Sequence, residues 1–262
     1  MARSIWKGAI SFGLVSIPVA LFTATENKTP KFKMLRAQDG SAIKYKRVAE
    51  ADGKEVVWDD IVRGYEVEKG RYVVFTDEEL EAATARGGSK IVDVVQFVEA
   101  QEIDPIFYRS SYYLVPEQTG LKAYRILLRA LKDKDRVGIA KFALREKEYL
   151  ATLRADGDVL ILETMFWPDE IRAPAFEELE SEVEVRDEEI KMAEMIIDNL
   201  TAPFEAASYH DPSREAIEEL ARKKIEGEEI VSPDTPEPTK VLDLLAALKA
   251  SVEATKEKRA AS

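Results

Sequence analysis

The side chains that most often carry out catalysis are scarce in this chain of 262 residues, which has one histidine and no cysteine. The histidine, His210, lies between Tyr209 and Asp211, and a lone histidine is far more often structural than catalytic or metal-ligating. Without cysteine, the chain cannot use thiol catalysis, disulfides or thiolate metal sites. The acidic residues of 177–189 could bind a cation, but a solvated acidic face explains them better. We therefore expect neither a metal nor a cofactor.

An amine is the one remaining nucleophile that could do covalent chemistry here. Lys31 or Lys44 could form a Schiff base with an abasic sugar, although nothing nearby distinguishes such a lysine from one that contacts a phosphate. The sequence holds no phosphate-binding glycine loop, dinucleotide fingerprint, nucleophile elbow or zinc-protease motif. The residue types thus favour a binding protein over an enzyme.

Charge is strongly segregated along the chain, although the net charge is −12. Residues 28–47 hold seven basic residues and one acid, residues 121–147 hold nine and three, and residues 163–238 hold 23 acids and seven basic residues. Such segregation can present a positive surface despite an acidic total, the alternative being ordinary solvated faces. The candidate nucleic-acid contacts are Lys28, Lys31, Lys33, Arg36, Lys44, Lys46, Arg47, Arg125, Arg129 and Lys132.

The elements that must position these cations begin with the strand-like opening of the chain. Apolar residues alternate from Ile10 to Leu14 and continue with the other parity from Val15 to Leu21. This pattern predicts a strand, a shift of face near 13–15 and a second strand. Pro18 excludes a long helix, and Lys7 and Ser11 interrupt what could be taken for a signal peptide. The sequence holds no run of 18 apolar residues, so we expect no membrane span and take a cytoplasmic protein as the default.

The middle of the chain is rich in predicted strands. They cover 43–48, 55–58, 72–75, 91–98, 106–115, 137–144, 149–153 and 159–166, with hairpin turns at Asp52-Gly53 and Asp156-Gly157. A capping box at 76–79 opens a helix that Gly87-Gly88 ends near Arg86. A second helix, 121–131, is expected to turn Ala123, Leu127, Ala130 and Leu131 to one side and Lys122, Arg125, Arg129 and Lys132 to another. Many short strands and few helices predict an α+β fold, mainly β, built on a barrel or sandwich.

After Pro168 the composition becomes acidic and helical. One helix is predicted over 188–200, with Ile190, Ala193, Ile197 and Leu200 on one face, and another from the N-cap Asp211 to about Ile225. The proline-rich stretch 232–238 is an extended linker. Beyond it, an amphipathic helix either folds back on its own body or binds a partner through Val241, Leu244, Leu245, Leu248 and Lys249.

Several blocks of the sequence, in order, resemble the bacterial Ku family, the DNA-end-binding proteins of non-homologous end joining. The opening block is Ile5-Trp6-Lys7-Gly8-Ala9-Ile10-Ser11-Phe12-Gly13-Leu14-Val15-Ser16-Ile17-Pro18-Val19. Later blocks include Ile103-Asp104-Pro105, Tyr112-Tyr113-Leu114-Val115-Pro116, Phe166-Trp167-Pro168-Asp169-Glu170-Ile171-Arg172 and Asp243-Leu244-Leu245-Ala246-Ala247-Leu248. The likeness covers nearly the whole length. The chain departs from many relatives in lacking cysteines at 48–53 and a long lysine-rich tail.

The resemblance implies a seven-stranded β-barrel core, residues 1–175, that includes a DNA-encircling bridge at about 26–71. It implies an acidic helical arm for dimerisation over 176–230, and a linker with a recruitment helix over 231–262. Two chains would form a homodimeric ring, and the end of a double-stranded DNA would pass through it. The protein would not be an enzyme, and it would be a cytoplasmic protein associated with the nucleoid. Binding would use phosphates and sugars with little base reading. The last helix would recruit the ATP-dependent DNA ligase D.

Two other functions stay open at this point. One is a lysine-dependent lyase acting on abasic sites or 5′-deoxyribose phosphates at DNA ends. The other is a basic RNA or DNA chaperone without preference for ends.

Overall fold

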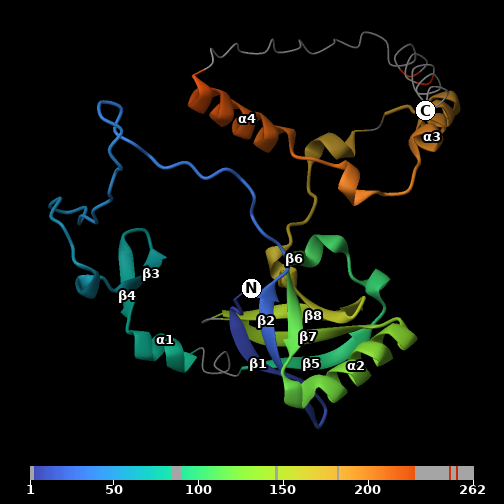
Figure 1. The fold of residues 1–262 in the computed structure, drawn as a ribbon, viewed down its shortest axis with the longest axis horizontal. Coiled ribbons are helices and arrows are strands. Elements are labelled where there is room, and N and C mark those ends of the chain that lie inside the picture. The colour runs from blue at the N-terminus through green and yellow to red at the C-terminus, as the bar shows by residue number, and fades with distance from the viewer. Residues whose placement is uncertain are drawn as a thin grey trace. The chain divides into compact units, whose positions relative to one another are not determined.

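The computed structural model describes residues 3–83, 90–144, 147–181 and 183–227, together with Leu248 and Val252. The chain divides into two compact units, one formed by residues 1–27 and 33–173 and the other by residues 28–32 and 174–262. The first unit contains the β-barrel and the second the C-terminal helices (Figure 1). Within the described residues, no helix is long and apolar enough to cross a membrane.

The barrel begins with a tight hairpin of β1 (Trp6–Phe12) and β2 (Val15–Thr23). Phe12 pairs with Val15, so Gly13 and Leu14 form a two-residue turn, and Gly13 supplies the positive φ of 59° that such turns need. The prediction of a shift of face near 13–15 is therefore wrong, because the chain makes a hairpin turn there and reverses direction. The reversal explains the change of parity, since Ile10 and Ile17 pair directly and are both buried.

Five further strands close the barrel in the order β1-β2-β6-β9-β8-β7-β5 (Figure 1). They are β5 (Ile91–Val98), β6 (Tyr108–Pro116), β7 (Val137–Leu144), β8 (Lys147–Asp156) and β9 (Val159–Met165). Alternate residues point inward and form one apolar core that includes Leu114, Phe142, Leu153 and Leu162. The seven-stranded barrel that the family resemblance implied is confirmed.

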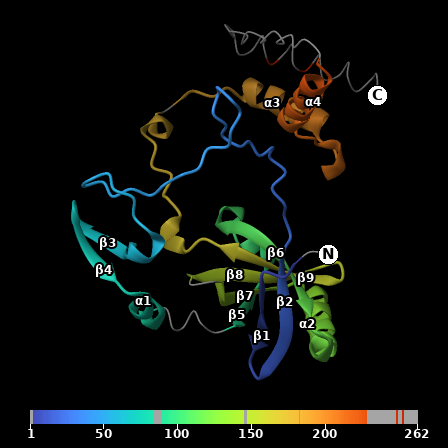
Figure 2. The same ribbon diagram turned by 60° about the vertical axis from the view of Figure 1, so that its left-hand side comes forward.

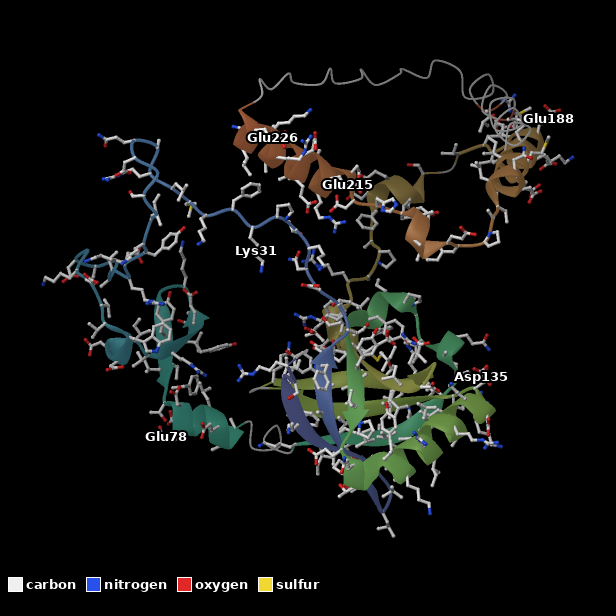
Figure 3. The ribbon with its side chains drawn as sticks, viewed as in Figure 1. Lys31, Glu78, Asp135, Glu188, Glu215 and Glu226 are labelled. Carbon is white, nitrogen blue, oxygen red and sulfur yellow. The ribbon has the colours of Figure 1, made fainter. Side chains whose placement is uncertain are left out.

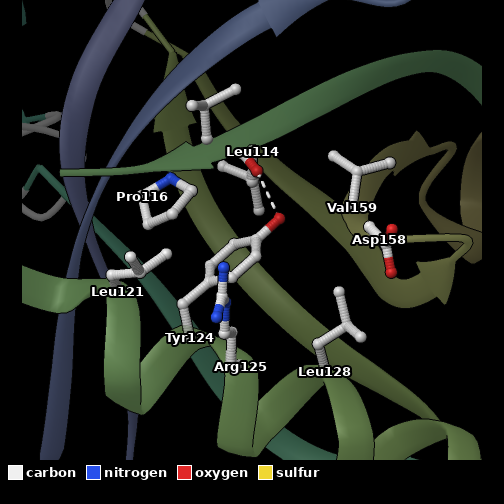
Figure 4. Close-up of a pocket in the computed structure, with 9 residues that line it drawn as sticks. Leu114, Pro116, Leu121, Tyr124, Arg125, Leu128, Asp158 and Val159 are labelled. Carbon is white, nitrogen blue, oxygen red and sulfur yellow. Dashed lines mark hydrogen bonds between the residues drawn. The ribbon is translucent and has the colours of Figure 1, made fainter. Parts of the chain in front are cut away.

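Helix α2 (Leu121–Lys134) joins β6 to β7 and buries Tyr124, Leu127 and Leu131 against the core. The hydroxyl of Tyr124 donates to the carbonyl of Leu114 at 2.6 Å and accepts from the amide of Leu160 at 2.6 Å (Figure 4). The burial of Tyr124 raises the pKa of its hydroxyl. The sequence analysis placed Ala130 on the buried side and did not include Tyr124, whereas Ala130 is exposed.

The insertion between β2 and β5 runs from Ala24 to Lys90 and contains the predicted bridge. The strands predicted over 43–48 and 55–58 are wrong, because only the isolated bridges Leu35–Ala42 and Val48–Glu55 form there. Nearly every residue of 31–60 is exposed, and a two-stranded hairpin without a surface to pack on is marginal.

The later part of the insertion is more regular. An unpredicted strand, β3 (Arg63–Glu68), pairs with β4 (Arg71–Phe75), as Figure 2 shows, and the capping box of Thr76 and Glu79 opens α1 (Asp77–Ala83) as predicted. The predicted end of that helix at 86–88 lies outside the described residues.

The second unit holds α3 (Asp187–Leu200) and α4 (Pro212–Glu226). The carboxylate of Asp211 accepts from the amides of Ser213 and Arg214, which confirms its predicted role as N-cap. Neither helix buries a residue. Single 3-10 turns complete the described chain at Trp58–Asp60, Ala100–Glu102, Pro105–Phe107, Gln118–Gly120, Pro168–Glu170, Glu177–Glu180 and Ala206–Ser208.

Replacing Tyr124 by phenylalanine should lower the free energy of unfolding by about 1–3 kcal/mol, because a buried carbonyl and a buried amide lose their shared partner. Equilibrium unfolding in urea measures the change. Tyr113→Phe is the matched control, since that side chain is exposed on the neighbouring strand. Equal losses in both variants would show that the Tyr124 hydroxyl contributes nothing specific.

Candidate nucleic-acid interface

The first basic run folds at its centre into a short hairpin, which we call the bridge hairpin (residues 33–45). Arg36 pairs with Ser41 and Met34 with Ile43 through backbone hydrogen bonds of 2.9 and 3.2 Å, on either side of the Leu35–Ala42 bridge. Asp39 and Gly40 form the tip, where Gly40 has a φ of 68°. The Arg36 guanidinium, with help from the amide and hydroxyl of Ser41, holds the pKa of the Asp39 carboxyl well below its usual range.

This register gives the bridge hairpin two chemically different faces. Met34 and Ile43 share one face, and the hydroxyl of Tyr45 lies 3.6 Å from the Met34 sulfur, as expected of diagonal neighbours on that face. Because strand residues alternate, Lys33 and Lys44 belong to the opposite face. The two faces differ but both are mixed, because Arg36 shares the face of Met34 and Ile43 and Leu35 shares that of Lys33 and Lys44.

The seven basic residues of the first run differ in how far their charge is already neutralised. Arg36 pairs with Asp39, Lys46 lies 2.6 Å from Glu55, and the Arg47 guanidinium sits 4.4 Å from the ring centre of Trp58. Lys28 also has an interaction within the structure. Of these seven residues, Lys31, Lys33 and Lys44 are exposed and form no ion pair within the described part of the chain.

The free lysines lie on two parts of the chain. Lys31 projects from the extended segment after β2 (Figure 3) and, with Lys28, belongs to the unit that contains the acidic helices. Lys33 and Lys44 belong to the unit of the barrel. All three are exposed, so none has the desolvated setting that activates an amine as a nucleophile.

The second predicted cluster lies on the outer side of α2, where Arg125, Arg129 and Lys132 are all exposed. Arg129 lies 3.4 Å from Asp133 in the next turn. β2 runs antiparallel to β6, so the insertion leaves the barrel after Thr23 in the direction of the start of β6, whereas α2 follows the end of β6. The two basic clusters are therefore attached at opposite ends of the barrel.

Sequence reasoning missed several charged residues on the outside of the barrel. Arg154 contacts Glu163 at 2.8 Å across β8 and β9, and Ser111 donates to the same carboxylate at 3.2 Å. Arg109 lies over the ring of Phe166 and Lys147 over that of Tyr149. Their signal in the sequence was weak, because a cross-strand pair becomes visible only when the register is known. The contacts of Glu163 with Arg154 and Ser111 join neighbouring strands, whereas Lys147 and Tyr149 both lie on β8.

The other candidates from the sequence are His210, a metal site and the partner-binding residues of the last helix. His210 is exposed and follows Tyr209, whose ring stacks on Phe204 at 5.5 Å. No group of three acidic or histidine residues in the described part of the chain could hold a metal ion. Of the partner-binding residues, Val241, Leu244, Leu245 and Lys249 lie outside the described residues, whereas Leu248 is half-buried and helical.

Comparison with known proteins agrees with this architecture. The family model described as the Ku70/Ku80 beta-barrel domain matches residues 11–192. A protein of Heliobacterium modesticaldum named "Non-homologous end joining protein Ku" is 44% identical over 258 residues, which cover 98% of this chain and 93% of that protein. Its namesake in Bacillus subtilis is 41% identical over 97% of this chain and 83% of its own. The namesake in Frankia casuarinae is 47% identical, but this chain spans only 65% of its length.

A closed seven-stranded barrel with a long insertion that begins with a basic run, and a helical C-terminal part, defines a barrel protein of the Ku70/Ku80 type. At 41–47% identity over nearly its full length, this chain belongs to the bacterial Ku family of non-homologous end joining proteins.

Proposed function

We propose that this chain binds the ends of double-stranded DNA, without regard to sequence, as a homodimeric ring in the repair of double-strand breaks. The observation that carries the proposal is the set of exposed, unpaired ammonium groups of Lys31, Lys33 and Lys44 on the insertion of a Ku-family barrel. Unpaired lysines can neutralise phosphates and release the cations condensed on the DNA, which is the main source of sequence-independent affinity for DNA.

The chemistry of these residues favours contact with the DNA backbone. Lysine is a point charge without the planar fork that reads base edges in pairs. The arginines of the bridge, Arg36 and Arg47, are already engaged with Asp39 and Trp58. The arrangement thus suits a protein that must accept any sequence at a broken end, and it supports binding over the lyase alternative.

Ring formation is supported by apolar surface that one chain leaves uncovered. Ile190, Ile197 and Leu200 on α3 are exposed, and so are Tyr65, Tyr72 and Val74 of the β3–β4 hairpin. Apolar faces of this extent mark sites of association with another chain. We assign to the arm helices α3 and α4 the role of packing against the other subunit of the dimer.

Recruitment of the ATP-dependent DNA ligase D is the last part of the proposal. We assign it to the apolar stripe of the final helix, which follows a proline-rich linker in the sequence and could reach a partner on that tether.

Linear duplex should compete for binding and covalently closed circular DNA of the same sequence should not, because a closed ring loads only at ends. Filter binding at moderate salt measures both. Changing Lys31, Lys33 and Lys44 to glutamine should weaken binding to all sequences alike and reduce the salt slope by up to ~5.4, at about 0.9 per phosphate contact for the six lysines of the two chains.

The control for this triple variant changes Lys191, Lys223 and Lys224 of α3 and α4 to glutamine, which alters the net charge equally. It should leave DNA affinity unchanged. Equal competition by circles would refute the threaded ring, and an unchanged salt slope in the first variant would refute the assignment of the three lysines.

The purified protein should have twice the chain mass of 29.5 kDa by light scattering. Changing Ile197 and Leu200 to aspartate should produce monomers and abolish end binding, because charges would be buried in the interface. Glu194→Gln with Asp198→Asn on the same helix should remain dimeric. If the aspartate variant stayed dimeric, α3 would not be part of the subunit interface.

Deleting residues 240–262 should leave end binding intact and abolish stimulation of ligase D on nicked or broken duplex. The comparison is made at protein concentrations that saturate the DNA, so that occupancy is equal for both forms. Retained stimulation would place the ligase contact elsewhere on the chain.

A further inference from the structure

Helix α2 presents an outer surface that DNA binding through the bridge leaves unused. Lys122, Arg125, Arg129 and Lys132 recur at intervals of three and four residues, which aligns them along one side of the helix. Leu121 and Ile126, both large and apolar, are exposed among them. A surface that mixes cations with uncovered apolar side chains is better suited to a protein segment than to a phosphate backbone alone.

This surface is hollowed into a groove that runs over Arg125. One cavity of about 570 Å³ lies along the outside of α2, with Ile126 and Arg129 in its wall. A second, of about 560 Å³, lies between α2 and the ends of β6 and β9 (Figure 4). Leu121 and Arg125 line both cavities, so the two hollows adjoin each other along α2, and we call them together the α2 groove.

The chain also carries a segment whose chemistry complements the α2 groove. Residues 176–185 contain five glutamates and no basic residue. Their four large apolar side chains, Phe176, Leu179, Val183 and Val185, are 58–76% exposed. We call residues 176–185 the acidic segment. It pairs negative charge with apolar anchors, as the α2 groove pairs positive charge with apolar walls.

We propose that the α2 groove binds the acidic segment of a second copy of this chain. Apolar side chains of the acidic segment fill the groove beside Leu121 and Ile126, and its glutamates face Lys122, Arg125 and Arg129. The two surfaces differ from each other, so the contact is heterologous, and a heterologous contact can join one dimer to the next. This contact is separate from the ring interface and from the DNA contacts of the bridge.

Sedimentation velocity of the full-length protein without DNA tests the proposal. At low salt the wild type should form species larger than the dimer. High salt should dissociate these species into dimers, because salt screens exposed ion pairs. Arg125→Glu with Arg129→Glu should reduce this association at least tenfold, and so should Glu177→Lys with Glu178→Lys and Glu184→Lys. Mixing the two variants should restore it, because each then meets a complementary charge.

The matched control, Lys223→Glu with Lys224→Glu on α4, changes the charge equally and should associate like the wild type. The absence of larger species in the wild type, or a failure of the mixed variants to restore them, would overturn the proposal. A contact made within one chain would also appear as absence of larger species.

A second measurement separates this inference from the proposed DNA function. The sequence made Arg125 and Arg129 candidate DNA contacts, and the present proposal removes them from that role, so the Arg125→Glu, Arg129→Glu variant should bind a short linear duplex, with room for one ring, as tightly as the wild type does. A loss of affinity for that duplex would overturn the proposal by placing α2 on the DNA surface. End binding itself would still stand, because linear and circular competitors test it independently.

Discussion

Closure of the barrel depends on one parallel ladder, between β1 and β5. Ala9, Ile10 and Ser11 of β1 pair with Ile91, Val92 and Asp93, and the amide of Ala9 bonds the carbonyl of Lys90 at 2.9 Å. Gly8 permits this approach, since a Cβ there would lie 2.1 Å from the Lys90 carbonyl oxygen. The same ladder fixes where the insertion returns to the barrel. β1 pairs with both β2 and β5, so the insertion starts and ends on neighbours of one strand.

Anchoring at both ends allows an insertion that has almost no core of its own. Its cations stay exposed because nothing folds over them, and for the same reason its apolar residues stay exposed too. A surface of this kind is stable in water only if other molecules cover part of it. The bridge hairpin shows this mixture on both faces, because Lys33 and Lys44 share one face with Leu35, and Met34 and Ile43 share the other with Arg36.

Local patterns in the sequence were enough to predict most of the barrel strands and helix starts. Alternation located β5 and β7 at their observed bounds, and Asp211 and the capping box at Thr76 located the starts of α4 and α1. Those features depend on neighbours within a few residues. The β1–β2 reversal was misread because a two-residue turn and a bulge change parity in the same way. β3 was not predicted, although Tyr65 and Val67 alternate with Glu66 and Glu68, because that alternation covers only four residues.

What the sequence could not provide was pairing over distance. Tyr124 appeared as one more residue of an amphipathic helix, yet its hydroxyl joins β6 to β9 through partners 10 and 36 residues away. The same limit applies to the cations, because counting charge in a run treated Arg36, Lys46 and Lys44 alike. The structure separates them by their partners, since Asp39 and Glu55 neutralise the first two. A cation that already has a carboxylate partner must give up that partner before it can neutralise a phosphate, so the paired and unpaired cations of one run are not equivalent.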